Sequence, residues 1–226
     1  NERIIMLKPC QILLTTQGWF KTILGVGIIS LFFISCQKEN CDSTPYPSLI
    51  TEFVNLRTDE HGTAVTFHND QGEVFNIDNQ IENLYPNATY RIVCGYEVTD
   101  KSTKNAIIYK VKNVEVLKEQ STTRCDALNV IAVWMGGNFI NLHLNPKTQG
   151  GEHEWGYHLD RISSNREQKV YHLSLFHNQK EDPTSYTEDI YACINLSQLT
   201  GIQSGDSIYI SIQTFEKDKT WCFQYH

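Results

Sequence analysis

The stretch Asp206-Ser-Ile-Tyr-Ile-Ser-Ile-Gln-Thr214 decides the fold class of this chain, because its apolar and more polar residues alternate. Ile208, Ile210 and Ile212 occupy every second position. A period of two is the period of a β-strand that has one buried face and one more polar face. We therefore predict a half-buried strand over residues 206–214.

Similar segments surround this strand at intervals of roughly a dozen residues, a spacing typical of all-β domains. They are residues 127–134, 138–144, 153–161, 169–177, 190–197 and 219–225. The pair Gly136-Gly137 predicts a hairpin turn between the first two. About seven alternating strands in about 100 residues predict an immunoglobulin-like antiparallel β-sandwich over residues 121–226.

The preceding block, residues 49–120, also consists of strand patterns. Its expected strands are residues 49–56, 63–67, 73–77, 88–98 and 106–117, with a turn at residues 69–72. In the longest of them, Tyr90, Ile92, Cys94 and Tyr96 share one face. About five strands in about 70 residues predict a small OB-like barrel. Residues 118–123 have the composition of a linker.

The N-terminal segment contains an apolar run from Ile23 to Ile34 that follows Lys21. A helix that spans a bilayer needs about 20 apolar residues, so this run is short for a permanent membrane span. A positive region, a short apolar run and a small residue at its end are typical of a secretory signal peptide. We therefore predict a signal peptide over residues 1–35. Met6 is a candidate for the true start, which the sequence leaves open.

The end of this run, Phe33-Ile34-Ser35-Cys36, resembles the lipobox of bacterial lipoproteins. The resemblance implies that Cys36 becomes the lipid-attachment residue and anchors the protein to the outer membrane. Several acyl chains on one residue give stable anchoring. Residues 36–48 are polar, contain two prolines and predict a tether. They leave open whether the protein faces the periplasm or the cell surface.

The net charge of −7 and the scattered lysines and arginines exclude a nucleic-acid partner, since phosphate backbones bind clustered cations. The chain has seven cysteines, none in a spacing typical of a zinc site. Five lie beyond Cys36, at positions Cys41, Cys94, Cys125, Cys193 and Cys222. We expect most of them to be small buried hydrophobes. An oxidising compartment also permits one disulfide, between Cys125 and either Cys193 or Cys222.

Histidines are the most obvious candidates for metal ligands in this sequence, but their pattern predicts no metal site. His143 and His172 alternate with apolar neighbours and are expected to point outward, and residues 152–154 read as a solvated hairpin. No Gly-x-Ser-x-Gly nucleophile elbow occurs. We therefore predict no catalytic residue, cofactor or metal ligand.

The best candidate for a local structural or functional motif in the sequence consists of His177, Asn178 and Asp182. Asn and Asp cap turns by bonding nearby backbone groups, so a structural turn is the first interpretation. Functional residues also gather on loops, so a contact with a partner is the second.

Several segments together resemble the NigD-like lipoproteins of the Bacteroidetes. The resemblance is carried by Trp134–Leu144, Val170–Pro183, Tyr191–Leu199 and Asp206–Tyr225, and in the first block by Tyr90–Val98 and Val111–Leu117. It departs at Phe176, where the family often has an arginine. The resemblance implies an OB-like domain followed by a β-sandwich, and a link to a bacteriocin operon.

The expected function is a non-catalytic binding or accessory module of the cell envelope, with an envelope protein, peptide or glycan as partner. Two alternatives remain open: a hydrolase that degrades the envelope or a polysaccharide, and an accessory protein of a bacteriocin system.

Overall fold

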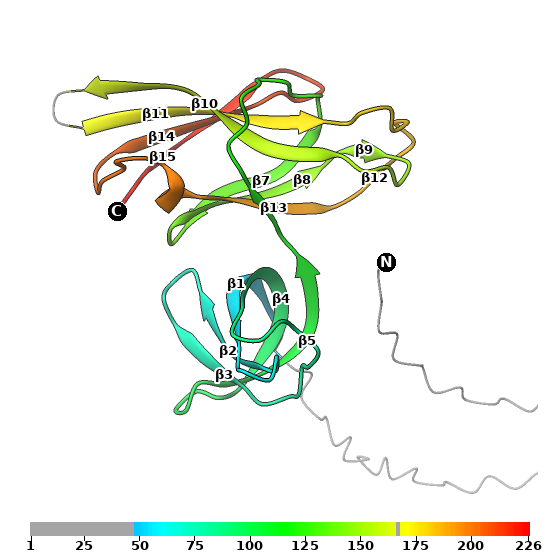
Figure 1. Cartoon of the computed structure of the whole chain (residues 1–226), viewed down its shortest axis with the longest axis vertical. Coiled ribbons are helices and arrows are strands. Elements are labelled where there is room, and N and C mark those ends of the chain that lie inside the picture. Colours follow the sequence, from blue (N-terminus) through cyan, green and yellow to red (C-terminus); the bar gives the residue numbers. More distant parts are fainter. Residues whose placement is uncertain (1–47, 166–167) are drawn as a thin grey trace, which may run out of the picture. The chain divides into compact units, whose positions relative to one another are not determined.

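The first set of strands in the computed structural model closes into a barrel (Figure 1). The model describes residues 48–165 and 168–226, so the predicted signal peptide and Cys36 lie outside the described residues. The barrel strands are β1 (Ile50–Thr58), β2 (Ala64–Asn69), β3 (Val74–Ile77), β4 (Thr89–Asp100) and β5 (Asn105–Asn113). They are ordered β1-β2-β3-β5-β4, and β4 pairs back with β1. This small Greek-key barrel is OB-like, as predicted.

The barrel core follows from the alternation in β4. Ile92, Cys94 and Tyr96 are buried in one cluster and Tyr90 packs against it, so the predicted inward face is confirmed. The predicted turn between β2 and β3 also forms, with Gly72 at a φ of 83° and the Gly72 amide donating to the Asn69 carbonyl at 3.1 Å. This turn carries Asp70 out of the barrel wall, which matters for the site described below.

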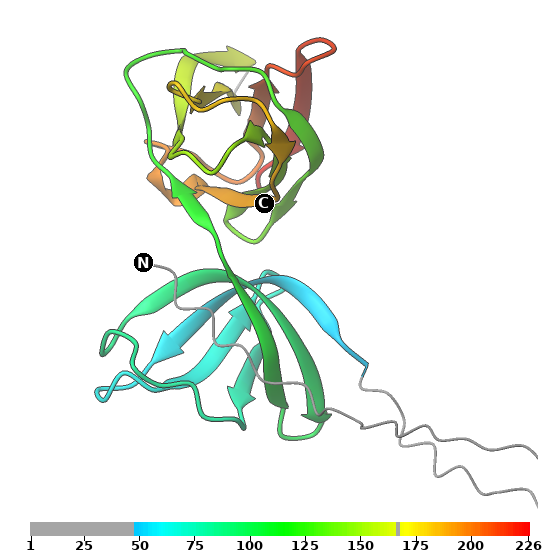
Figure 2. The same ribbon diagram turned by 90° about the vertical axis from the view of Figure 1, so that its right-hand side faces the viewer.

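The second set of strands forms a β-sandwich, whose two facing sheets can be followed in Figure 2. One four-stranded sheet has the order β10-β11-β14-β15, and the other has the order β6-β13-β8-β7. Their strands are β6 (Glu115–Leu117), β7 (Asn129–Gly136), β8 (Phe139–Asn145), β10 (Glu154–Asn165), β11 (Gln168–Asn178), β13 (Ile190–Asn195), β14 (Ser207–Ile212) and β15 (Lys219–Gln224). A two-stranded pair joins β9 (Lys147–Thr148) to β12 (Tyr186–Thr187).

The stretch at residues 206–214 behaves as its alternation predicts. Ile208, Ile210 and Ile212 of β14 are buried in the core between the two sheets. The sandwich is less uniformly antiparallel than expected, because β14 runs parallel to β11 and β6 runs parallel to β13. Among the described residues the one helix is a 3₁₀ turn, η1 (Leu196–Gln198), and none could cross a bilayer. The all-β fold class is confirmed.

The expected single strand over residues 106–117 is wrong, because the chain changes sheets within it. β5 ends at Asn113 in the barrel, and β6 then pairs with β13 in the sandwich. The segment expected to be a linker is also held in place. The Gln120 amide donates to the Tyr157 carbonyl at 2.7 Å, and the Tyr157 amide donates to the Lys118 carbonyl at 3.0 Å. The predicted domain limits at residues 120 and 121 stay predictions.

The structure does not contain the disulfide that an oxidising compartment would permit between Cys125 and either Cys193 or Cys222. Cys94, Cys125, Cys193 and Cys222 are all free thiols in the structure. Cys94 and Cys193 are fully buried on separate strands, and burial raises the pKa of Cys193 to about 11. They behave as small hydrophobes, which was the first interpretation.

Candidate functional site

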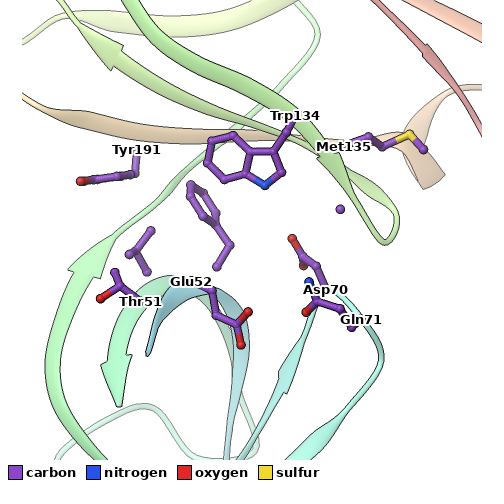
Figure 3. A pocket seen from close by; sticks show the side chains of 10 residues that line it. Thr51, Glu52, Asp70, Gln71, Trp134, Met135 and Tyr191 are labelled. Atoms are coloured by element: carbon purple, nitrogen blue, oxygen red, sulfur yellow. The ribbon is translucent and has the colours of Figure 1, made fainter. Parts of the chain in front are cut away.

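A groove of about 350 Å³ lies beside Glu52 and Trp134, and we call it the Glu52–Trp134 groove (Figure 3). Strand β1 contributes Glu52 and Phe53 to its wall, and the β2–β3 turn contributes Asp70 and Gln71. Strands β7 and β13 contribute Trp134 and Tyr191. The indole nitrogen of Trp134 is on the edge of the ring that faces Asp70 in Figure 3. The groove is thus built from barrel strands and from one sheet of the sandwich.

Strand alternation explains why the sandwich presents aromatic rings here. Ile140 and Leu142 of β8 point into the sandwich core, so Asn141 between them points to the opposite face. Asn141 is paired across the sheet with Trp134 on one side and with Cys193 on the other. This second face of the sheet is shielded from solvent at Asn141, which is fully buried.

Phe53 is the apolar contact that joins the two walls. Its ring lies edge-on to Trp134 at 5.2 Å between centroids and to Tyr191 at 6.0 Å. Edge-to-face pairs of this kind add stabilisation beyond the burial of apolar area. Phe53 is only 4% exposed, so it forms the floor of the groove and does not protrude into solvent.

Arg91 of β4 is the polar contact beneath the groove. Its guanidinium lies 2.7 Å from Oδ1 of Asp70 and donates to Oδ2 of Asp70 and to Oδ1 of Asn141, each at 2.9 Å. Asn141 in turn donates to Asp70 at 2.7 Å. The same guanidinium lies 4.0 Å from the centroid of the Phe139 ring. A buried charge is tolerated when it is paired and hydrogen-bonded. Arg91 is paired with Asp70 and hydrogen-bonded through Nη2, whereas its Nε and Nη1 are buried and have no hydrogen-bond partner among the described residues.

Glu52 differs from Asp70 in its partners. Its Oε1 accepts a hydrogen bond of 2.5 Å from the hydroxyl of Tyr96, a neutral donor. Burial, together with this bond to Glu52, raises the pKa of Tyr96, so the phenol stays protonated. Glu52 also lines a second cavity of about 410 Å³ at the end of the barrel, together with Phe75, Lys101 and Lys104.

The structure brings His177 and Asp182 together through a third residue, His153. Nε2 of His177 lies 3.0 Å from Nδ1 of His153, and Nε2 of His153 lies 3.0 Å from Oδ2 of Asp182. Asp182 also accepts hydrogen bonds from the Thr148 hydroxyl and the Gln149 amide. Residues 152–154 were expected to form a solvated hairpin, which is wrong for His153, whose side chain is 5% exposed.

The protonation states in this cluster follow from its geometry. Nδ1 of His177 lies 2.7 Å from the Asp126 carbonyl, which only accepts, so Nδ1 donates and Nε2 accepts. Nδ1 of His153 then donates to Nε2 of His177. Burial lowers the pKa of His177 to about 4, which agrees with a neutral ring. The hydrogen bond from Thr148 is the main reason that the pKa of Asp182 falls to about 2.

His177 is fully buried and stacks on Trp155 at 4.2 Å between centroids. Asn178 donates to Glu154 at 2.8 Å and accepts from the Lys180 amide at 3.0 Å, as a turn residue does. These contacts support the structural interpretation of His177, Asn178 and Asp182, and a contact with a partner there stays a prediction. Among the described residues, no three His, Cys, Asp or Glu side chains are grouped to hold a metal ion.

His143 and His172 lie outside the core, as their alternation predicts. His143 is 22% exposed and stacks on Tyr191 at 4.5 Å, and His172 stacks on Tyr209 at 5.3 Å.

The groove residues were missed by the sequence analysis. One signal was available in the sequence. Arg91, Val93 and Gly95 occupy the outward positions of β4, whereas a sheet face exposed to solvent is expected to contain mainly polar residues. This mixture indicates that the outward face of β4 is covered. The pairing of Arg91 with Asp70 and Asn141 had no sequence signal, because the partners lie 21 and 50 residues away.

The fold and the groove define a class of protein: an all-β chain in which an OB-like barrel precedes a β-sandwich. The model of the NigD-like C-terminal β-sandwich domain matches residues 107–225, which is more than half of the chain. The chain therefore belongs to the NigD-like family.

Solved structures share this fold. A NigD-like immunity protein from Bacteroides caccae ATCC 43185 is 22% identical, with a TM-score of 0.64 over 80% of this chain and 99% of that chain. A protein of unknown function from Bacteroides vulgatus ATCC 8482 is 12% identical, with a TM-score of 0.62 over 79% of this chain and 92% of that chain. A protein from Bacteroides fragilis NCTC 9343, provisionally described as a lipoprotein, is 14% identical, with a TM-score of 0.58 over 80% of this chain and 99% of that chain. No curated protein matches the chain in sequence.

Proposed function

We propose that this protein is a lipid-anchored protein of the cell envelope that binds a partner in the Glu52–Trp134 groove without catalysing a reaction. The observation that carries the proposal is the groove itself, which combines aromatic rings with a carboxylate in a concave site of about 350 Å³. Sites that bind small molecules or side chains have this size and this mixture of apolar walls and few polar groups.

Two carboxylates line the groove, which raises the hydrolase alternative. Glycosidases need one carboxyl group as an acid and a second as a base or nucleophile. Both oxygens of Asp70 are engaged by Arg91, and one of them also by Asn141, so Asp70 has no free role in proton transfer. The His177–His153 pair is enclosed by its own chain. These contacts favour binding over hydrolysis.

The lipid anchor is placed at Cys36, from which the protein extends on its tether from the outer membrane. The lipobox-like segment supports this location, and so does the fold shared with the Bacteroides fragilis protein that is provisionally described as a lipoprotein.

A second candidate function is an accessory role in a bacteriocin system. It is favoured by the structural likeness to the protein named a NigD-like immunity protein. A strain that lacks this chain is then expected to become sensitive to its own bacteriocin, and Trp134→Ala is expected to cause the same loss of protection.

Photo-crosslinking in intact cells tests the binding function. A benzoylphenylalanine at Gln71, which is exposed at the groove, is expected to form one discrete adduct that Trp134→Ala abolishes. The same probe at Ile162 is the matched control, because Ile162 is also exposed but lies on β10 of the other sheet. Adducts of equal yield at both positions, or an adduct that survives Trp134→Ala, would contradict the proposal.

A further inference from the structure

The Glu52–Trp134 groove carries a negative charge that the described residues do not neutralise there. In residues 48–165 and 168–226, no lysine or arginine lines this groove. The charge of Asp70 is matched by Arg91, at 2.7 Å, whereas the one hydrogen bond that Glu52 accepts from a described side chain comes from the neutral hydroxyl of Tyr96. Lys101 and Lys104 line the second cavity on the other side of Glu52, and Lys104 lies 2.6 Å from its own partner, Glu73. A positive group on a partner would complement the groove.

The aromatic rings around the groove already attract the chain's own cations. The ammonium of Lys112 lies 4.7 Å from the centroid of the Tyr191 ring, and the guanidinium of Arg91 lies 5.4 Å from that of Phe53. In the part of the chain that the structure describes, no lysine or arginine is positioned over Trp134 in this way. Tryptophan is the side chain that attracts a cation best.

We propose that the Glu52–Trp134 groove binds a basic side chain, lysine or arginine, of a peptide segment of the partner. The ammonium or guanidinium lies against the Trp134 ring and forms an ion pair with the free oxygen of Glu52. The groove volume of about 350 Å³ suits a side chain of a peptide better than a folded surface. This inference rests on the proposed function, because it names the chemistry of the group that the groove binds.

Titration of the full chain with short peptides tests the proposal. The probe is acetyl-Gly-Lys-Gly-amide, and its control is the same peptide with an Nε-acetylated lysine, which keeps the length and loses the charge. The readout is the indole N–H resonance of Trp134 in an NMR spectrum, assigned by its loss in Trp134→Phe. We expect the lysine peptide to shift this resonance and the acetylated peptide to leave it in place.

Glu52→Gln is expected to weaken binding of the lysine peptide about tenfold, as loss of a charged partner does. Glu97→Gln is the matched control, because Glu97 also accepts a tyrosine hydroxyl, that of Tyr109 at 3.0 Å, but does not line the groove. Glu97→Gln should leave the affinity unchanged. If Glu52→Gln fails to fold, the comparison of the two peptides on the unaltered protein still decides the question.

Equal binding of the charged and acetylated peptides would overturn the proposal, as would an unchanged affinity in folded Glu52→Gln. A shift of the Trp134 resonance by maltohexaose, with no shift by the lysine peptide, would also overturn the proposal and would identify a glycan-binding groove. The binding function can be judged separately. A crosslinked adduct from position 71 that depends on Trp134 would support the binding function even if the charge of the peptide has no effect. If neither the adduct nor charge-dependent peptide binding is observed, both proposals are refuted.

Discussion

Arg91 is a buried charge, because its side chain is only 3% exposed to solvent. It is held by Asp70 and Asn141 on its polar side and by the Phe139 ring on its apolar side. Removing one partner of such a pair leaves the other as a buried and uncompensated charge, which costs far more than the pair itself contributes.

Arg91→Met is therefore expected to lower the free energy of unfolding by about 3–5 kcal/mol. The matched control is Lys104→Met, which breaks the half-exposed pair with Glu73 and should cost at most about 1 kcal/mol. Denaturant unfolding of both variants gives the two values. The double variant Arg91→Met with Asp70→Asn should lose less than the sum of the single changes, because the charges are coupled. Similar losses of unfolding free energy in Arg91→Met and Lys104→Met would argue against a buried ion pair between Arg91 and Asp70.

His177 predicts how stability depends on pH. Its pKa is about 4 in the folded chain and 6.5 ordinarily, so the unfolded chain binds more protons between these values. The stability is therefore fully present above pH 6.5 and falls as the pH drops toward 4, by roughly 3 kcal/mol in all. Asp182, with a pKa of about 2 against 3.8, adds a loss below pH 4.

Unfolding measured from pH 8 to pH 4, the range in which the imidazole of His177 titrates, checks this expectation. The variant His177→Gln should show a flatter dependence on pH. His172→Gln serves as the control, since His172 stacks on Tyr209 outside the core. If the slopes of the unaltered protein and His177→Gln are the same, the burial of His177 does not control acid stability.

At the scale of elements, the segment from Lys118 to Gln120 lies directly on β10. A Cβ on Gly156 would lie 2.5 Å from Cγ of Gln120 and 2.7 Å from the Lys118 carbonyl oxygen. The carbonyl is part of the backbone that pairs with Tyr157, so it cannot move away without loss of hydrogen bonds.

Gly156→Ala is expected to destabilise the fold by about 1–3 kcal/mol, as overpacking of a tight site does. Gly95→Ala is the control, because a Cβ there meets its nearest atom only at 3.6 Å. Thermal unfolding of the two variants separates them. A melting temperature for Gly156→Ala equal to that of Gly95→Ala would show that residues 118–120 can shift at no cost.

At the scale of the whole molecule, the proposed location depends on one thiol. Cys36→Ser is expected to move the protein from the membrane fraction to the soluble fraction, because the serine cannot form the thioether to the lipid. Cys222→Ser is the control, as Cys222 is a free and exposed thiol in β15. Fractionation followed by immunoblotting gives the result, and a Cys36→Ser protein that stays with the membrane would refute the anchor.

Much of the fold could be predicted because it depends on local alternation. The face of Tyr90, Ile92, Cys94 and Tyr96 and the three isoleucines of β14 follow from a period of two in the residues themselves. The turn at residues 69–72 follows from its Asn, Asp and Gly content. The short strand β6 could not be assigned in this way, since three residues contain too little pattern to show which sheet they join.

The sequence by itself determined the all-β class, most of the longer strands and the likeness to the NigD-like family. Only the tertiary structure decided that Arg91 meets Asn141, that Trp134 and Glu52 share a groove, and that His153 links His177 to Asp182. The physical reason is distance along the chain. Alternation acts between neighbours and is visible in a short window, whereas a buried ion pair or a groove forms from residues that folding alone brings together.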